Sequence, residues 1–137
     1  MGGVAAVIHG APMTTFDLDA LVRVNQVNAE RLIGALNELE AHFREHRKLI
    51  VPTEEDILAG GHLLLLTLAG PLDVLGYIGD HQRYDDLIDQ TSEVNLGGGT
   101  LKVLGLEELI RQKRAMGRPK DRAAAELLEE VLRLRSA

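Results

Sequence analysis

The stretch TTFDLDALV, residues 14–22, places two aspartates inside an alternating run of apolar and β-prone residues. This alternation predicts a strand over residues 15–22. Side chains two positions apart lie on one face of a strand, so Asp17 and Asp19 project together and the apolar residues beside them face the other way. Two carboxylates this close repel each other unless solvent, a basic side chain or a divalent cation offsets their charge. A solvated pair on an exposed edge is the commonest arrangement for an isolated Asp-x-Asp.

A third aspartate, Asp73, interrupts the apolar run PLDVL at residues 71–75. A carboxylate among apolar residues costs free energy unless a cation or hydrogen-bond donors accompany it. One interpretation is an aspartate that caps a nearby loop, and the other is a metal ligand shared with Asp17 and Asp19. Hard carboxylate oxygens suit Mg²⁺ or Mn²⁺, which retain water and bind phosphate oxygens.

A diglycine, Gly2-Gly3, opens the run GGVAAVIHG, over which we expect a short helix from residue 2 to residue 10. The N–H groups at a helix N-terminus bind anions, and glycine allows a phosphate to approach the backbone closely. The diglycine is therefore a candidate phosphate cradle, with a flexible chain end as the alternative interpretation.

The composition predicts one soluble domain over all 137 residues, with 21 acidic and 15 basic residues and a formal charge of −6. That charge argues against a general nucleic-acid coat and leaves room for a local basic patch. The absence of cysteine excludes disulfides and thiolate metal sites and fits a reducing cytoplasm. The most apolar run, residues 62–76, is interrupted by Gly70, Pro71 and Asp73, and is too short to span a bilayer. We therefore expect a cytoplasmic protein without a membrane partner.

Periodicity and turn residues predict both helices and strands in the rest of the chain. Helices are expected over residues 28–46 with Asn28 as N-cap, over 84–91, over 106–116 with Gly117 after it and over 119–135, with a helical turn at 52–55. Strands are expected over 48–51, 62–68 and 71–78, and over 92–96 and 100–105 as a glycine-rich hairpin. The expected fold class is α/β, with a small mixed sheet flanked by helices.

A basic cluster stands out near the C-terminus of this acidic chain. Its members are Arg111, Lys113, Arg114, Arg118, Lys120 and Arg122. In one interpretation these residues hold nucleotide phosphates or an RNA acceptor. In the other they are solvated charges near a helix C-terminus, which favours cations. The sequence favours the two interpretations about equally.

The ordered combination resembles the nucleotidyltransferase superfamily related to DNA polymerase beta. That family has Gly-Gly or Gly-Ser before a helix, Asp-x-Asp on the next strand and a third Asp on a later strand. The matching positions are Gly2, Gly3, Asp17, Asp19 and Asp73. His9-Gly10 and KRAMGRPKD, residues 113–121, resemble the minimal bacterial and archaeal branch that includes toxin–antitoxin nucleotidyltransferases. The sequence departs from that branch at Met13, where an Arg is usual, and it lacks the helix and strand that precede the diglycine in the family.

The resemblance implies a nucleotidyltransferase fold and transfer of a nucleoside monophosphate from a nucleoside triphosphate to an acceptor hydroxyl. It implies that Asp17 and Asp19 hold Mg²⁺ or Mn²⁺, and that Asp73 shares a metal ion and helps to deprotonate or orient the acceptor. The nucleotide-binding residues that it implies are Gly2, Gly3, Thr15, Lys113 and Lys120. The acceptor would be a tRNA, a protein or a small molecule, and a small antitoxin would be a partner. The alternative is a catalytically degenerate module of the same fold that binds nucleotide, RNA or a partner protein; Met13 and the missing first strand favour it, and the three aspartates favour the enzyme.

Overall fold

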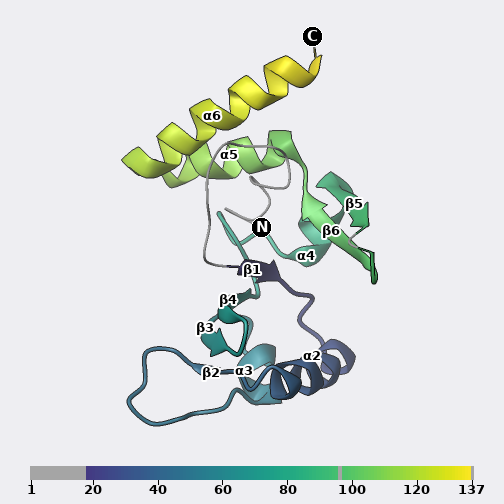
Figure 1. Ribbon diagram of the computed structural model, residues 1–137, viewed down its shortest axis with the longest axis vertical. Coiled ribbons are helices and arrows are strands. Elements are labelled where there is room, and N and C mark those ends of the chain that lie inside the picture. The colour runs from purple at the N-terminus through teal and green to yellow at the C-terminus, as the bar shows by residue number, and fades with distance from the viewer. Residues whose placement is uncertain (1–17, 96, 137) are drawn as a thin grey trace. The chain divides into compact units, whose positions relative to one another are not determined.

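The computed structural model describes residues 18–95 and 97–136 of the chain (Figure 1). Within them the fold is mixed α and β, as expected, with helices, a four-stranded mixed sheet and a two-stranded sheet. The chain divides into two compact units, whose described residues are 18–85 in the first and 86–95 and 97–136 in the second. The helix expected over residues 2–10, and Gly2, Gly3, Met13, Thr15 and Asp17, lie outside the described residues. The expectation of one domain stays a prediction.

The first unit is built on a sheet in which the strand order is β1-β4-β3-β2. Its strands are β1 (Leu18–Leu21), β2 (His42–Phe43), β3 (His62–Thr67) and β4 (Gly70–Leu75). β1 runs parallel to β4, whereas β3 is antiparallel to both of its neighbours. The expected neighbouring strands at 62–68 and 71–78 are confirmed as the β3–β4 hairpin, and the described part of the strand expected at 15–22 is confirmed as β1.

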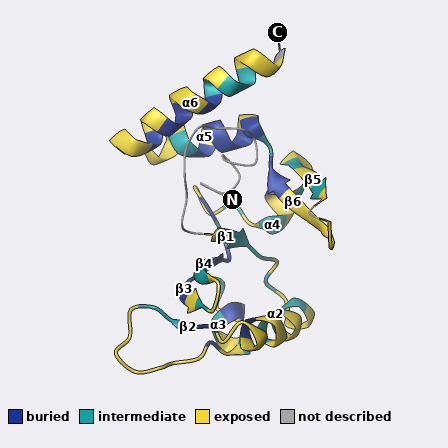
Figure 2. Ribbon diagram, in the orientation of Figure 1, coloured by how far each residue is buried: buried dark blue, intermediate teal, exposed yellow. Residues whose placement is uncertain are grey.

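One face of this sheet packs against helices α2 (Gln26–Glu38) and α3 (Glu54–Leu58). The apolar cluster between them joins Leu36 and Ile57 from the helices to Leu65 and Val74 from the sheet, each at most 3% exposed. The buried residues of α2, Ala29 and Leu36, are seven positions apart and so lie on one side of the helix. Much of the rest of α2 is exposed (Figure 2). Alternation along the strands therefore directs every second side chain into this core.

α2 begins earlier and ends earlier than its sequence pattern predicts. Its N-cap is Asn25, in an extended conformation, whose Oδ1 accepts a hydrogen bond from the backbone N of Asn28 at 2.8 Å. The prediction of Asn28 as the cap is wrong, because the side chain of Asn28 donates instead to the carbonyl of Arg23 at 2.7 Å. The predicted helical end at residue 46 is also wrong. The chain turns at Glu40, with a φ of 51°, and Phe43 then pairs with Leu65 in the sheet.

Residues 48–51 do not form the predicted strand. They lie in an irregular loop in which Leu49, Ile50 and Val51 are 75%, 41% and 49% exposed. One backbone hydrogen bond, from the N of Phe43 to the carbonyl of Ile50, ties the loop to the sheet. β-prone residues form a strand only where a neighbouring edge supplies a ladder. The helical turn expected at 52–55 is confirmed and extends to Leu58 as α3, which begins with a capping box between Thr53 and Asp56.

The second unit combines a hairpin with two long helices. The hairpin is β5 (Thr91–Asn95) and β6 (Thr100–Leu104), and the helices are α5 (Leu106–Met116) and α6 (Pro119–Ser136). α5 and α6 pack side by side, with Leu109 and Leu128 fully buried. Gly117 ends α5 in a left-handed conformation with a φ of 69°, which glycine adopts without strain. The predicted hairpin and both predicted helices are confirmed, and the helix expected at 84–91 appears as α4 (Tyr84–Leu87) and a 3₁₀ turn (Ile88–Gln90).

Among residues 18–95 and 97–136, no helix combines the length and apolar character that crossing a membrane requires. The cytoplasmic location stays a prediction.

Two glycines of the first unit provide a matched test of its packing. A Cβ at Gly76 would lie 2.3 Å from the carbonyl oxygen of Gly60, whereas a Cβ at Gly34, inside α2, would meet nothing within 4 Å. We expect Gly76→Ala to lower the free energy of unfolding by about 2 kcal/mol or more, because backbone would have to move. Gly34→Ala should raise it by about 1 kcal/mol, because alanine favours the helix. Urea unfolding measures both, and shifts of the same sign would contradict this packing.

Candidate site on the strand β1–β4 pair

The parallel pairing of β1 with β4 sets Asp19 directly opposite Asp73. Paired residues on neighbouring strands share a face of the sheet, and the strands are about 4.8 Å apart. Both side chains therefore project from the same face, and both are partly buried. Two of the three predicted carboxylates are thus brought together, from segments more than fifty positions apart in the chain.

The apolar residues of β4 agree with that register, because they pack on the core side of the sheet. Leu18 and Ala20 of β1 pair with Leu72 and Val74 of β4, and Val74 belongs to the core beneath the sheet. A slip of one residue would turn every side chain of β1 to the opposite face. Asp19 would then face the apolar core, where an unpaired carboxylate is costly. The aspartates therefore lie on the face that the core does not use.

Arg44 is a member of this site that the sequence did not reveal. It directly follows β2, and its Nη2 lies 2.9 Å from Oδ1 of Asp73, with the two side chains 29% and 19% exposed. The backbone N of Arg44 donates to the carbonyl of Leu64, and Leu64 is the partner of Asp73 in the β3–β4 ladder. Arg44, Leu64, Asp73 and Asp19 thus form one row across the sheet, which we call the Asp19–Asp73 row.

The side chains of this row include two candidate cation ligands. Asp19 and Asp73 place two carboxylates beside each other on neighbouring strands, and carboxylate oxygens are the ligands that Mg²⁺ and Mn²⁺ prefer. In the part of the chain that the structure describes, no group of three or more His, Cys, Asp or Glu side chains is placed to hold a metal ion. The third predicted ligand, Asp17, lies outside that part. The donor chemistry of Asp19 and Asp73 fits the predicted metal.

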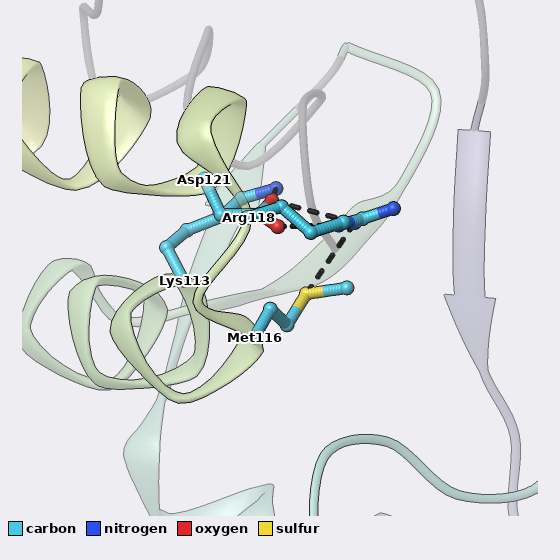
Figure 3. A network of polar contacts seen from close by, with 4 residues as sticks. All are labelled: Lys113, Met116, Arg118 and Asp121. Atoms are coloured by element: carbon cyan, nitrogen blue, oxygen red, sulfur yellow. Dashed lines mark hydrogen bonds and ion pairs between the residues drawn. The ribbon is translucent and has the colours of Figure 1, made fainter.

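Lys113, one of the two predicted nucleotide-binding lysines, lies in a network around Asp121 in the second unit (Figure 3). Asp121 is 2% exposed, and its Oδ1 lies 3.8 Å from Nζ of Lys113. Nε of Arg118 donates to Oδ2 of Asp121 at 2.5 Å, and Nη2 of Arg118 contacts Sδ of Met116 at 3.8 Å. The network ties the end of α5 to the first turn of α6.

The hydrogen bond from Arg118 holds the pKa of Asp121 below its ordinary value, against the opposing effect of burial. The positive charges of Arg118, Lys113 and Lys120 act in the same direction as that hydrogen bond. Asp121 is thus a buried carboxylate kept ionised by its neighbours. The carboxylate of Asp121 partly offsets the charge of Lys113, whereas Lys120 is exposed.

Other members of the basic cluster also have acidic partners. Nη1 of Arg111 lies 2.6 Å from Oε2 of the buried Glu108, and Arg114 pairs with Glu129 of α6. These contacts are structural, because each links side chains within the α5–α6 pair. They favour the interpretation of surface and packing charge for Arg111, Arg114 and Arg118.

The predicted site residues fall in both units: Asp19 and Asp73 in the first, and Lys113 and Lys120 in the second. Comparison of the chain with family models and with curated proteins found no match.

A double-mutant cycle would test the Arg44–Asp73 pair. Because both side chains are partly shielded from water, we expect Arg44→Gln and Asp73→Asn to show a coupling energy of about 1–2 kcal/mol, between the values for exposed and buried pairs. Chemical unfolding of the single and double variants measures it. Arg47→Gln, in the exposed loop that follows, is the matched control and should leave stability nearly unchanged. Additive effects of the two substitutions would contradict the ion pair.

The lowered pKa of Asp121 predicts a particular pH dependence. The unfolded chain takes up a proton near the ordinary pKa of about 3.9, whereas the folded protein does so at lower pH. Asp121 therefore stabilises the fold fully above that ordinary pKa, and its contribution is lost as the pH falls through the lowered value. We expect the difference in melting temperature between the wild type and Asp121→Asn to be constant from pH 7 to 5 and to shrink below pH 4. A difference that persists unchanged to pH 2.5 would contradict the ionised buried carboxylate; Asp80→Asn, at an exposed turn, is the control.

Proposed function

We propose that the protein is a Mg²⁺-dependent nucleotidyltransferase that moves a nucleoside monophosphate from a nucleoside triphosphate to an acceptor hydroxyl. The observation that supports this most is the pairing of Asp19 with Asp73 on the sheet face opposite the core. Carboxylates from two neighbouring strands on one sheet face are a donor set for Mg²⁺ beside a phosphate. The proposal also draws on the resemblance of the glycines and aspartates to the nucleotidyltransferase superfamily.

The three aspartates would hold the metal ions, Asp17 and Asp19 from one segment and Asp73 from β4. Mg²⁺ or Mn²⁺, when bound, would neutralise the triphosphate and stabilise the entering and leaving oxygens of an in-line displacement. The acceptor hydroxyl would form a bond to the α-phosphorus as the bond to pyrophosphate breaks, and its proton would pass to the Asp73 carboxylate. Arg44 would orient that carboxylate through its contact with Oδ1.

The remaining predicted residues would bind the nucleotide. Gly2, Gly3 and Thr15 would contact the phosphates, and Lys113 and Lys120 would offset their charge. A tRNA, a protein or a small molecule would be the acceptor. A small antitoxin partner belongs to the same proposal, because the resemblance extends to the toxin–antitoxin branch.

A second candidate is a catalytically degenerate module of the same fold that binds nucleotide, RNA or a partner protein. The Arg44–Asp73 ion pair favours it, because a guanidinium 2.9 Å from Oδ1 already offsets charge that a metal ion would otherwise offset. In such a module, nucleotide binding would not depend on a divalent cation.

Calorimetric titration with ATP, GTP, CTP and UTP, with Mg²⁺ or with a chelator, tests the enzyme. We expect triphosphate binding that requires Mg²⁺, and its loss in Asp19→Asn, because the variant removes a charged oxygen ligand. Asp80→Asn supplies the same chemical change at an exposed turn and should bind like the wild type.

Two results would count against the enzyme. One is triphosphate binding that is equal with and without Mg²⁺, which supports the module. The other is an Asp19→Asn variant with unchanged Mg²⁺-dependent binding, which would remove Asp19 from the site. If triphosphate binding requires Mg²⁺ as expected, pyrophosphate release in the presence of a tRNA mixture, or of the protein itself as acceptor, measures turnover of the wild type.

A further inference from the structure

An open pocket of about 290 Å³ lies at the carboxyl end of β1, within the first unit. Its apolar lining comes from the end of β1 and the residue after it, Leu21 and Val22, and from Val27 of α2. In α/β proteins, ligands bind outside the carboxyl ends of strands, at points where strand order switches. β1 and its parallel neighbour β4 both end here, where the backbone N of Val22 donates to the carbonyl of Leu75. Neither the aspartates nor the lysines of the proposed enzyme line this pocket.

One wall of the pocket is a guanidinium laid over an aromatic ring. The Cζ of Arg23 lies 4.7 Å from the ring centroid of Tyr84, a cation–π contact. Asp85 contacts the same guanidinium, with Oδ1 at 3.1 Å from Nε and 3.0 Å from Nη2 of Arg23. Asp85 therefore balances the charge of Arg23, and the guanidinium and the ring together present a surface on which another planar group can stack.

The other wall of the pocket carries Arg31, an exposed arginine of α2. Val27 and Arg31 are four residues apart on α2, and so lie on one face of that helix. Within residues 18–95 and 97–136, Arg31 has no hydrogen bond or ion pair, and its side chain lines the pocket. α2, which is described throughout, has no acidic residue in its first turn. Asn25 also lines the pocket; its Oδ1 is used by the backbone of Asn28, which leaves its NH₂ as a donor.

We infer that this pocket binds a small phosphate monoester that carries a planar ring, such as a nucleoside monophosphate. The phosphate accepts hydrogen bonds from the Arg31 guanidinium and the Asn25 amide, and the ring packs between Val27 and the Arg23–Tyr84 wall. Guanidinium groups bind phosphate through paired hydrogen bonds and stack on planar bases. The volume is at the lower limit of the roughly 300–1,000 Å³ typical of small-molecule pockets, which suits a single nucleotide.

Titration of the intact chain with AMP, CMP, GMP, UMP and inorganic phosphate, in a chelator, tests this site. We expect at least one nucleoside monophosphate to bind more tightly than inorganic phosphate, because only the nucleotide uses the apolar and planar walls. Arg31→Gln should weaken that binding at least tenfold. Arg47→Gln, which removes an exposed arginine elsewhere in the same unit, should leave it unchanged.

A second substitution separates the two parts of the pocket. Val27 is 59% exposed, so Val27→Gln keeps the helix and removes only the apolar contact. It should weaken nucleotide binding while leaving inorganic phosphate binding as it was. The inference is overturned if no monophosphate binds, if inorganic phosphate binds equally well, or if Arg47→Gln has the same effect as Arg31→Gln.

The inference does not depend on the proposed enzyme, and the variants keep the two apart. Monophosphate binding in a chelator should be unchanged in Asp19→Asn, and Mg²⁺-dependent triphosphate binding should persist in Arg31→Gln. Triphosphate binding without a metal ion that is lost in Arg31→Gln would be assigned to the pocket. Triphosphate binding without a metal ion that persists in Arg31→Gln would be assigned to the degenerate module. Loss of monophosphate binding in Asp19→Asn would overturn the separate pocket.

Discussion

The first unit depends on the pairing of β1 with β4. Among the described residues, β1 has four residues and pairs with β4, so its position depends on four paired residues and on Val22, which follows β1 and packs against the core. Leu72 and Val74 of β4 pair with Leu18 and Ala20 of β1. The same register fixes the polar side, because side chains alternate along both strands. The closeness of Asp19 and Asp73 is thus a consequence of packing the opposite face.

Each unit places a sheltered carboxylate beside a guanidinium, but the neighbours of that pair differ. In the second unit, Asp121 has Arg118 and Lys113 around it, so the cations outnumber the carboxylate and keep it ionised. In the first unit, Arg44 contacts Asp73, and a second carboxylate, Asp19, is paired with Asp73 on the neighbouring strand. The first arrangement joins two helices. The second brings together two carboxylates, the donor type that divalent cations prefer.

The sequence predicted best those elements whose signals are local. The β3–β4 hairpin, the β5–β6 hairpin and helices α5 and α6 follow from turn glycines and periodic apolar residues, and all are present. It failed over residues 39–51, where tertiary contacts override local preference: Phe43 continues the helical spacing of α2, yet pairs with Leu65 of β3. That error also hid Arg44, because a residue assigned to a helix end could not be placed beside Asp73. The site was therefore predictable as aspartates on strands, and its arginine was not.

The position of Arg44 bears on how the Asp19–Asp73 row would work as a metal site. A guanidinium on Oδ1 of Asp73 limits the rotation of that carboxylate and restricts how its other oxygen is presented. Adding Asp17, two residues before Asp19, would bring a third carboxylate to the row, and a divalent cation would offset part of the charge of the three. Without Arg44, three carboxylates would repel one another more strongly whenever the cation is absent. On this reasoning Arg44 is compatible with the enzyme as well as with the degenerate module. It would stabilise the metal-free fold and hold Asp73 in one orientation for the metal-bound state.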